Sequence, residues 1–215
     1  MSNSDTTVVI CCAGMGTRLG IGTTKALLHI GGKPLIIHQL ENLDSYNDVR
    51  IVVGYQADNV IETVNRYRKD VMFCFNNEYQ TTSPSMSRVK GAINSKKYIL
   101  SIDGDVLINP DDFQQMLEIN GEYLAVSKKH SEEPDLVTVN NGTVQCFSES
   151  GNFEWPGIVK VESENLIRNN GEVNNMFPVP AFLIEQGISI LKMTMIMQLN
   201  GFKTDIVKVI GIWKI

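Results

Sequence analysis

The sequence predicts an α/β domain built on a mostly parallel central sheet. Short apolar runs alternate with helical patterns along the first half, and each run is continuously apolar, as expected for a strand covered on both faces. Strand–helix–strand repetition of this kind also predicts right-handed crossovers. The predicted strands of this half are Val8–Cys12, Val49–Val53, Val71–Phe75 and Tyr98–Ile102.

The helices between these strands have recognisable starts and apolar stripes. A helix-compatible proline opens the first and the third, and Val60, Ile61, Val64 and Tyr67 form a stripe on the second. The predicted helices are Pro34–Leu43, Ala57–Lys69 and Pro84–Ser95.

The second half predicts a smaller mixed portion that packs on the first as a lid or acceptor lobe. Its Asn141-Gly142 pair is typical of a hairpin turn. The predicted strands are Glu122–Ser127, Leu136–Val139, Thr143–Phe147, Gly157–Val161 and Asp205–Ile210, with a helix at Gly187–Leu199.

Length and composition exclude several classes of protein. The chain has 215 residues, a net charge of −5 and 43% hydrophobic residues, which fits one globular domain and argues against a non-specific nucleic-acid binder. Its longest apolar stretch, Gly187–Leu199, is too short to span a membrane and contains Lys192. The N-terminus has no positive region, so we expect no secretory signal. Four cysteines without CxxC spacing favour a reduced, cytoplasmic location.

The segment that follows the first strand is the most informative. Cys12-Ala13-Gly14-Met15-Gly16-Thr17-Arg18-Leu19-Gly20 combines glycines with a cation, and Lys25 follows. Glycines let the backbone approach a bulky anion, and Arg18 and Lys25 add the charge that suits a triphosphate. The dinucleotide and Walker patterns both fail here, because Leu19 and Leu27 stand where they need glycine. The alternative is a glycine-rich turn with surface charges.

Two further loops follow strands at the same edge of the predicted sheet, where ligands bind in such folds. Asp103-Gly104-Asp105 offers hard oxygen ligands for Mg²⁺, or else forms a solvated turn. The polar stretch Asn76–Ser87, which includes Gln80, Thr81, Thr82 and Ser83, offers hydrogen bonds to a base or ribose. Ser83 is also placed to cap the helix that Pro84 begins.

Taken together, these motifs resemble the signature of sugar-phosphate nucleotidyltransferases. The resemblance rests on Val9–Gly20, Lys25 and Gly32-Lys33-Pro34-Leu35-Ile36. Asn76–Ser87, Gly104-Asp105 and Glu154–Ile158 look most similar to the small cytidylyltransferases of the CTP:phosphocholine type.

The resemblance implies a Rossmann-like three-layer α/β/α fold in a single domain, with residues 1–120 binding the nucleotide and 121–215 the acceptor. It implies that Cys12, Ala13, Gly14, Met15, Gly16 and Thr17 hold base and phosphates, with Gln80–Ser83 and Asp103 also on the nucleotide. Arg18 and Lys25 become the catalytic cations, and Asp105 the Mg²⁺ ligand. Trp155 and Lys160 are candidates for the acceptor, although core packing and solvation are the alternatives.

The sequence departs from the family pattern in three places. Thr24 replaces a usual proline, and Ser83 and Pro84 replace two asparagines of the choline subgroup. The aspartate that commonly follows the C-terminal aromatic residue is not present after Trp213-Lys214-Ile215. Either the chain is shortened there, or Asp205 substitutes, or metal binding is weakened.

The implied reaction is attack by a phosphate or phosphonate oxygen on the α-phosphorus of CTP, with release of pyrophosphate. An ionised nucleophile needs no general base, in agreement with the unrelated contexts of the three histidines. Three alternatives remain: a uridylyl- or other nucleotidyltransferase acting on a sugar 1-phosphate, a glycosyltransferase, and a nucleotide-binding module without catalysis.

Overall fold

The computed structural model describes residues 5–16, 22–129 and 134–173, together with the backbone of three short strands near the C-terminus. Those strands are β12 (Ala181–Leu183), β13 (Val207–Val209) and β14 (Ile212–Lys214). Within this part of the chain, no helix is both long and apolar enough to cross a membrane.

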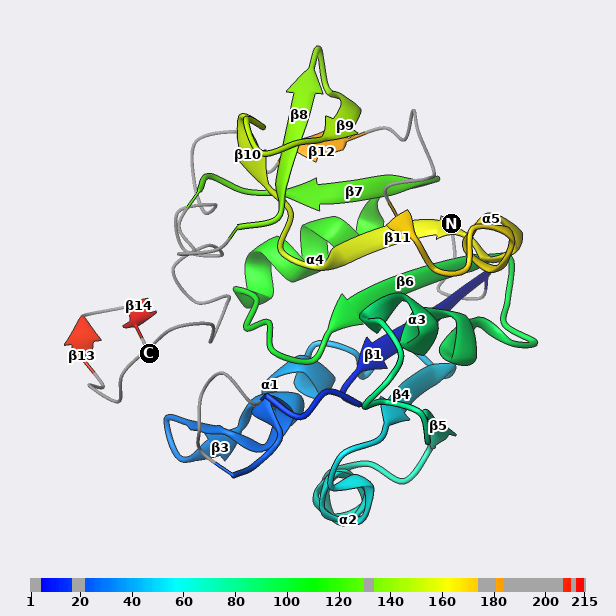
Figure 1. Cartoon of the computed structure of the whole chain (residues 1–215). Helices are drawn as coiled ribbons and strands as arrows, with labels where there is room; N and C mark the ends of the chain where they lie inside the picture. The colour runs from blue at the N-terminus through cyan, green and yellow to red at the C-terminus, as the bar shows by residue number, and fades with distance from the viewer. Residues whose placement is uncertain are drawn as a thin grey trace.

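The first half alternates strands and helices as predicted (Figure 1). A 3₁₀ turn, η3 (Lys25–Leu27), and the short pair β2 (His29–Ile30) and β3 (Lys33–Pro34) stand between the first strand and the first helix. The longer elements are β1 (Thr6–Cys11), α1 (Leu35–Glu41), β4 (Val49–Val53), α2 (Ala57–Tyr67), β5 (Val71–Phe75), α3 (Pro84–Ala92), β6 (Tyr98–Asp103) and α4 (Pro110–Glu118).

The second half adds strands to the same sheet and builds a small sheet of its own. Its elements are β7 (Tyr123–Val126), β8 (Leu136–Asn140), β9 (Thr143–Phe147), β10 (Phe153–Glu154), β11 (Ile158–Glu162) and α5 (Ser163–Arg168). Strands β8, β9 and β10 form the small antiparallel sheet. Asn141 and Gly142 both have positive φ between β8 and β9, which confirms the predicted hairpin turn.

The central sheet has the order β12-β7-β11-β6-β1-β4-β5. Strand β1 pairs in parallel with β4 and β6, β4 with β5, and β7 with β12. Strand β11 runs antiparallel to both of its neighbours, β6 and β7. The predicted fold class, a mostly parallel α/β sheet with a smaller mixed portion, is therefore confirmed.

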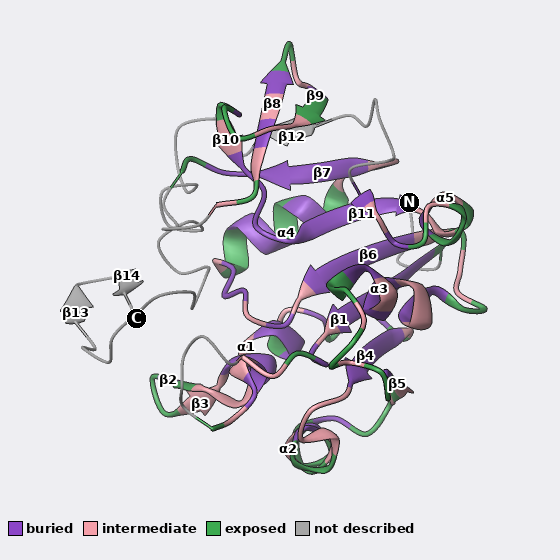
Figure 2. Cartoon of the chain, in the orientation of Figure 1, coloured by how far each residue is buried: buried purple, intermediate pink, exposed green. Residues whose placement is uncertain are grey.

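Helices and the small sheet cover the two faces of the central sheet. On one face, Val8 and Ile10 of β1 pack in a core that includes residues of α1, α2 and α4. On the other, Val9 packs with residues of α3, α5 and the small sheet. Figure 2 shows the central strands buried between these layers. Edge strand β5 differs from the prediction of a strand covered on both faces, since Met72 and Phe75 are exposed.

The remaining differences concern short or polar elements. Helix α4 was not predicted, although Asn109 caps it by accepting from the Asp111 amide and Pro110 begins it. Helix α5 is only six residues long. The predicted helix Gly187–Leu199 lies outside the described residues, and β13 falls within the predicted strand Asp205–Ile210.

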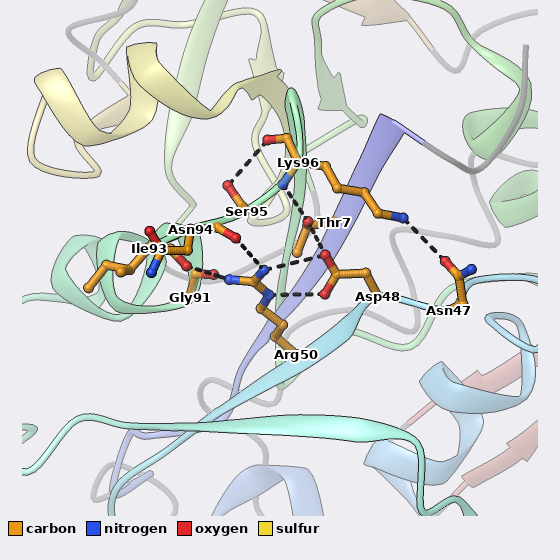
Figure 3. Close-up of polar contacts among 9 residues, drawn as sticks. All are labelled: Thr7, Asn47, Asp48, Arg50, Gly91, Ile93, Asn94, Ser95 and Lys96. Atoms are coloured by element: carbon orange, nitrogen blue, oxygen red, sulfur yellow. Dashed lines mark hydrogen bonds and ion pairs between the residues drawn. The ribbon is translucent and has the colours of Figure 1, made fainter.

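A buried arginine near the N-terminal end of β4 joins the sheet to the C-terminal end of α3 (Figure 3). Arg50 donates to both oxygens of Asp48 and to the carbonyls of Gly91, Ile93 and Asn94 at 2.6–3.3 Å. Thr7 of β1 also donates to Asp48, at 2.6 Å. These bonds satisfy carbonyls that the end of a helix leaves without partners. They hold α3, whose other end begins at the sheet edge where the predicted site lies.

Replacing Arg50 by Met is expected to lower the free energy of unfolding by about 3–5 kcal/mol, because Asp48 loses its cation and two hydrogen bonds and three carbonyls lose a donor. Burial alone would raise the pKa of Asp48, but hydrogen bonds from Arg50 and Thr7 outweigh it and lower that pKa. A carboxyl group whose pKa is lower in the folded than in the unfolded protein stabilises the fold at pH values above the unfolded-state pKa of about 4. This stabilisation is lost as the pH falls below that value. Urea denaturation should therefore show a smaller Arg50→Met effect at pH 3 than at pH 7; equal effects would contradict this account.

Candidate active site

A cavity of about 570 Å³ lies at the carboxyl edge of the sheet, where the loops after β1, β5 and β6 meet. This edge is where open α/β sheets bind ligands. Its lining comes from the loop after β1 and from η3 (Cys11, Cys12, Ala13, Gly14, Gly16, Thr24, Lys25, Ala26), from the loop after β5 and the start of α3 (Asn76, Tyr79, Thr82, Ser83, Pro84, Ser87), from the end of β6 (Asp103, Gly104, Asp105) and from Asp135.

The loops after β1 and β6 approach each other through a glycine. The Gly104 amide donates to the Cys11 carbonyl at 2.9 Å. A side chain at residue 104 would bring its Cβ to 2.7 Å from that oxygen and from Cys12 Sγ, too close for any residue but glycine. The close approach brings the two loops, and with them Lys25 and Asp105, to one side of the cavity.

The central charge pair of the cavity is Lys25 with Asp105. Lys25 Nζ lies 2.7 Å from Asp105 Oδ2, and both side chains are about one-fifth exposed or less (16% and 21%). The two residues are 80 positions apart in sequence. A cation and a carboxylate that face the same cavity provide one group for phosphate oxygens and one for a metal ion.

The second carboxylate, Asp103, has a different cation. Arg88 of α3 is 4% exposed and donates from one Nη to both Asp103 oxygens, at 3.0 and 3.3 Å. Its guanidinium also lies 5.0 Å from the centre of the Trp155 ring, a cation–π contact. Burial raises the pKa of Asp103 to about 6, against the lowering effect of Arg88. Sequence reasoning missed Arg88, because a single arginine within a helix gives no signal of its partner.

Gly157 fixes the other side of Asp103. It has φ +82°, and a Cβ there would collide with the Asp103 carboxyl group. The Asp103 amide donates to the Gly157 carbonyl at 3.1 Å. The turn before β11 therefore packs directly on the cavity carboxylate, and this position requires glycine.

The loop after β5 is organised by one buried amide. Asn76 is 1% exposed, and its Nδ2 donates to Thr82 Oγ1 at 3.1 Å and to Ser87 Oγ at 3.2 Å. The Tyr79 ring lies 6.2 Å from that of Tyr55 and also lines the cavity. Amide, hydroxyl and aromatic groups on one wall suit the edge and face of a nucleobase.

A buried glutamine supports the Asp105 loop from behind. Gln39 of α1 is 2% exposed, and its Nε2 donates to the carbonyls of Asp103 at 2.9 Å and Val106 at 2.6 Å. These bonds fix the backbone on both sides of Asp105. The one local sign of this role is that a polar residue interrupts the apolar pattern of α1.

Burial disfavours the thiolate form of the two cysteines at the cavity. Burial raises the pKa of Cys11 to about 12 and that of Cys12 well above its ordinary value. Because the thiolate is the reactive form, neither is suited to act as a nucleophile at neutral pH.

The structure brings most of the predicted site residues together. Those that line the cavity are Cys12, Ala13, Gly14, Gly16, Lys25, Thr82, Ser83, Asp103 and Asp105. Met15, Gln80 and Thr81 are outside the lining, and Gln80 and Thr81 are exposed. Thr17 and Arg18 are outside the described residues. Asp135, which does line the cavity, had no signal in the sequence.

Trp155 and Lys160 were predicted to contact the acceptor, and neither of them lines the described cavity. Trp155 is 8% exposed, donates to the Ile158 carbonyl and packs edge-on against Phe147. Lys160 donates to the Ile119 carbonyl at 2.8 Å, at the end of α4. Strand β11 runs antiparallel to β6, which carries Lys160 away from the carboxyl edge and opposite Leu100.

The residues at the cavity fit a magnesium ion. Among the described residues, no cluster of three or more Asp, Glu, His or Cys forms a complete protein cage. Mg²⁺ instead takes one or two carboxylates, and substrate phosphates and water complete its shell. Asp105, which lines the cavity, already holds a cation, the Lys25 ammonium, on its Oδ2.

The sheet, its glycine-bearing first loop and the charged carboxyl edge define an α/β protein of the nucleotidyltransferase fold. The chain belongs to the MobA-like NTP transferase domain family, whose model matches residues 8–153. This confirms the resemblance found in the sequence.

Relatives and solved structures agree with this assignment. GlmU, a bifunctional protein, is 23% identical over 184 residues in Neisseria meningitidis serogroup B (81% of this chain) and 27% identical over 184 residues in Methanococcus maripaludis (84% of this chain). This chain spans only 40% and 38% of the lengths of those proteins.

Three solved structures share the fold. CTP:phosphocholine cytidylyltransferase (LicC) from Streptococcus pneumoniae has a TM-score of 0.63 at 22% identity, covering 85% of this chain and 91% of that one. The inositol-1-phosphate CTP transferase of T. maritima has a TM-score of 0.69 at 14% identity, covering 83% and 85%. UDP-glucose pyrophosphorylase with UDP-glucose has a TM-score of 0.63 at 17% identity, covering 84% and 90%.

Replacing Arg88 by Met is expected to destabilise the protein by about 3 kcal/mol at pH 8, where the half-buried Asp103 carboxylate would lose its cation. The effect should shrink at pH 5: Arg88 lowers the pKa of Asp103, so without the guanidinium this pKa lies above about 6 and a proton neutralises Asp103 at pH 5. Urea denaturation at both pH values measures the difference. Arg66→Met is the matched control: it breaks an exposed pair with Glu62, and should cost less than about 0.5 kcal/mol. An equal loss in the two variants would contradict a role for the buried pair.

Proposed function

We propose that this protein is a Mg²⁺-dependent nucleotidyltransferase that transfers CMP from CTP to a small phosphorylated or phosphonylated acceptor. The observation that carries the proposal is the Lys25–Asp105 pair in a cavity lined by the glycine-bearing first loop. Family membership and the fold shared with two CTP-using enzymes support it. Four free thiols, at Cys11, Cys12, Cys74 and Cys146, support a reduced cytoplasmic location.

In the proposed reaction, an acceptor phosphate or phosphonate oxygen attacks the α-phosphorus of CTP. A P–O bond forms to the acceptor as the bond between the α-phosphorus and the bridging oxygen breaks, and pyrophosphate leaves with the electron pair. The acceptor oxygen is already ionised, so no side chain has to remove a proton. The protein's contribution is to position the two substrates and to stabilise the negative charge that develops.

Each wall of the cavity has a part in this scheme. Lys25 neutralises phosphate oxygens, and the Cys12–Gly16 backbone follows the nucleotide. Thr82 and Ser83 face the base or ribose. Asp105 would hold the Mg²⁺, which supplies electrostatic stabilisation of the triphosphate when bound. In this scheme residues 1–120 bind the nucleotide and residues 121–215 bind the acceptor. Asp135, from the second half, lines the same cavity.

A uridylyltransferase acting on a sugar 1-phosphate is the second candidate. The fold gives it equal support, because LicC and UDP-glucose pyrophosphorylase have the same TM-score against this chain. The two candidates share the chemistry and differ in the base, which the loop Asn76–Ser87 would read.

Pyrophosphate release tests the proposal directly. The protein should be incubated with Mg²⁺, each of the four nucleoside triphosphates and a panel of phosphorylated and phosphonylated small molecules. Release with CTP supports the first candidate, and release with UTP and a sugar 1-phosphate supports the second. Nucleotide binding without release from any pair indicates a binding module, whereas transfer of sugar from a nucleotide sugar indicates a glycosyltransferase.

Lys25→Ala is expected to lower turnover by about 10²–10³-fold, since one lost contact to developing charge costs about 3–4 kcal/mol of barrier. Lys33→Ala is the matched control, because Lys33 pairs with Glu41 and has a 39% exposed side chain. Steady-state rates of pyrophosphate release measure both variants. Wild-type rates in Lys25→Ala would remove the residue from the mechanism.

Asp105→Asn should abolish the gain in CTP affinity that Mg²⁺ provides, because the variant loses the charged ligand of the metal. Isothermal titration calorimetry with CTP, in the presence and absence of Mg²⁺, measures this gain. Asp111→Asn, at an exposed position of α4, should keep it. A full magnesium effect in Asp105→Asn would place the metal elsewhere.

A further inference from the structure

Gln56 has a backbone conformation that its side chain does not favour. It lies between β4 and α2 with φ 52° and ψ 38°, in the left-handed region. The other non-glycine residues with positive φ are Asn94, Asn141 and Asn170 in the part of the chain that the structure describes. Asparagine tolerates this region, whereas glutamine gains nothing from it locally. Such strain persists only where surrounding contacts fix it.

The side-chain hydrogen bonds of Gln56 all go to one segment, Gly22–Thr24. Its Oε1 accepts from Thr23 Oγ1 at 3.1 Å and from the Thr24 amide at 3.4 Å. Its Nε2 donates to the Gly22 carbonyl at 2.9 Å. The amide group of this one side chain therefore binds three successive residues, directly before Lys25.

The connection between β4 and α2 also contacts the beginning of the loop that follows β1. The Tyr55 amide donates to the Ala13 carbonyl at 3.0 Å. Ala13 follows β1 and Thr24 precedes η3, and both line the cavity. Residues 55 and 56 thus tie the loop at its beginning and at its end.

We propose that Gln56 is a positioning residue for nucleotide binding, which rests on the function proposed above. Its side chain holds Gly22–Thr24 so that Lys25 starts from a fixed backbone position and extends to the cavity. Gln56 does not line the cavity and belongs to neither of the two large apolar cores. It therefore acts through Thr23 and Thr24, without contact to the nucleotide.

Gln56→Gly separates this role from a structural one. Glycine adopts the left-handed conformation without strain, so the backbone change by itself should keep or raise the melting temperature. The loss of three hydrogen bonds should nevertheless weaken CTP binding with Mg²⁺ by about five- to tenfold, the size expected for one or two net hydrogen bonds. The KM for CTP should rise by a similar factor, with a smaller change in the KM for the acceptor.

Asn141→Gly is the matched control. Asn141 has φ 49° in the β8–β9 hairpin, so its replacement by glycine relieves the same kind of backbone conformation at a position that does not line the cavity. CTP affinity in this variant should equal that of the wild type. Hydrogen exchange of peptides spanning residues 22–28, measured without nucleotide, should be faster in Gln56→Gly and unchanged in Asn141→Gly.

The outcomes distinguish this inference from the proposed function. Wild-type CTP affinity in Gln56→Gly, or equal exchange in both variants, would overturn the role of Gln56. If the wild-type protein binds no nucleoside triphosphate, the proposed function fails. Faster exchange in Gln56→Gly would then show only that Gln56 restrains the segment Gly22–Thr24, and its role in nucleotide binding would be overturned as well. A fall in melting temperature of the same size in both glycine variants, without a difference in affinity, would mean that the residue only supports the turn.

Discussion

The arrangement of this protein depends on the ion pair between Lys25 and Asp105. The pair can form because β1 and β6 are neighbours in the sheet and run in parallel, so that the loops at their carboxyl ends emerge together. Gly104 lets the two loops touch. A cationic and an anionic side chain thereby share a single cavity, although the two residues lie far apart in sequence.

Asp103 and Asp105 are only two residues apart, yet each carboxylate has its own cation. Lys25 reaches Asp105 from the first loop, and Arg88 reaches Asp103 from α3. A buried carboxylate without a partner is costly, so this division lets two negative groups stand side by side. Arg50 holds α3 at its far end and so keeps Arg88 in place. The stability of the fold and the charge of the cavity are linked through this helix.

Residues outside the cavity determine how its charged groups are presented. Gln39 binds the backbone on both sides of Asp105, and Gln56 binds the segment before Lys25. Both use a neutral amide, which can donate and accept without adding charge to the site. Side chains from α1 and from the β4–α2 connection thus hold the backbone next to Asp105 and Lys25.

The α/β class, the strands of the first half and the three loops of the cavity can be predicted from the sequence, because buried parallel strands and glycine-bearing loops leave local patterns. Lys25 and Asp105 can be located for the same reason. The groups around the two cavity carboxylates could be found only in the folded protein. Arg88 and Asp135 interact with Asp103, and Gln39 binds the carbonyls of Asp103 and Val106. Each of these contacts spans 15 or more residues of sequence, so no short stretch identifies them. The tertiary structure also decided against Trp155 and Lys160 as cavity residues, because the direction of β11 and the packing of the Trp155 ring are properties of strand pairing and of the core, which no short stretch of sequence encodes.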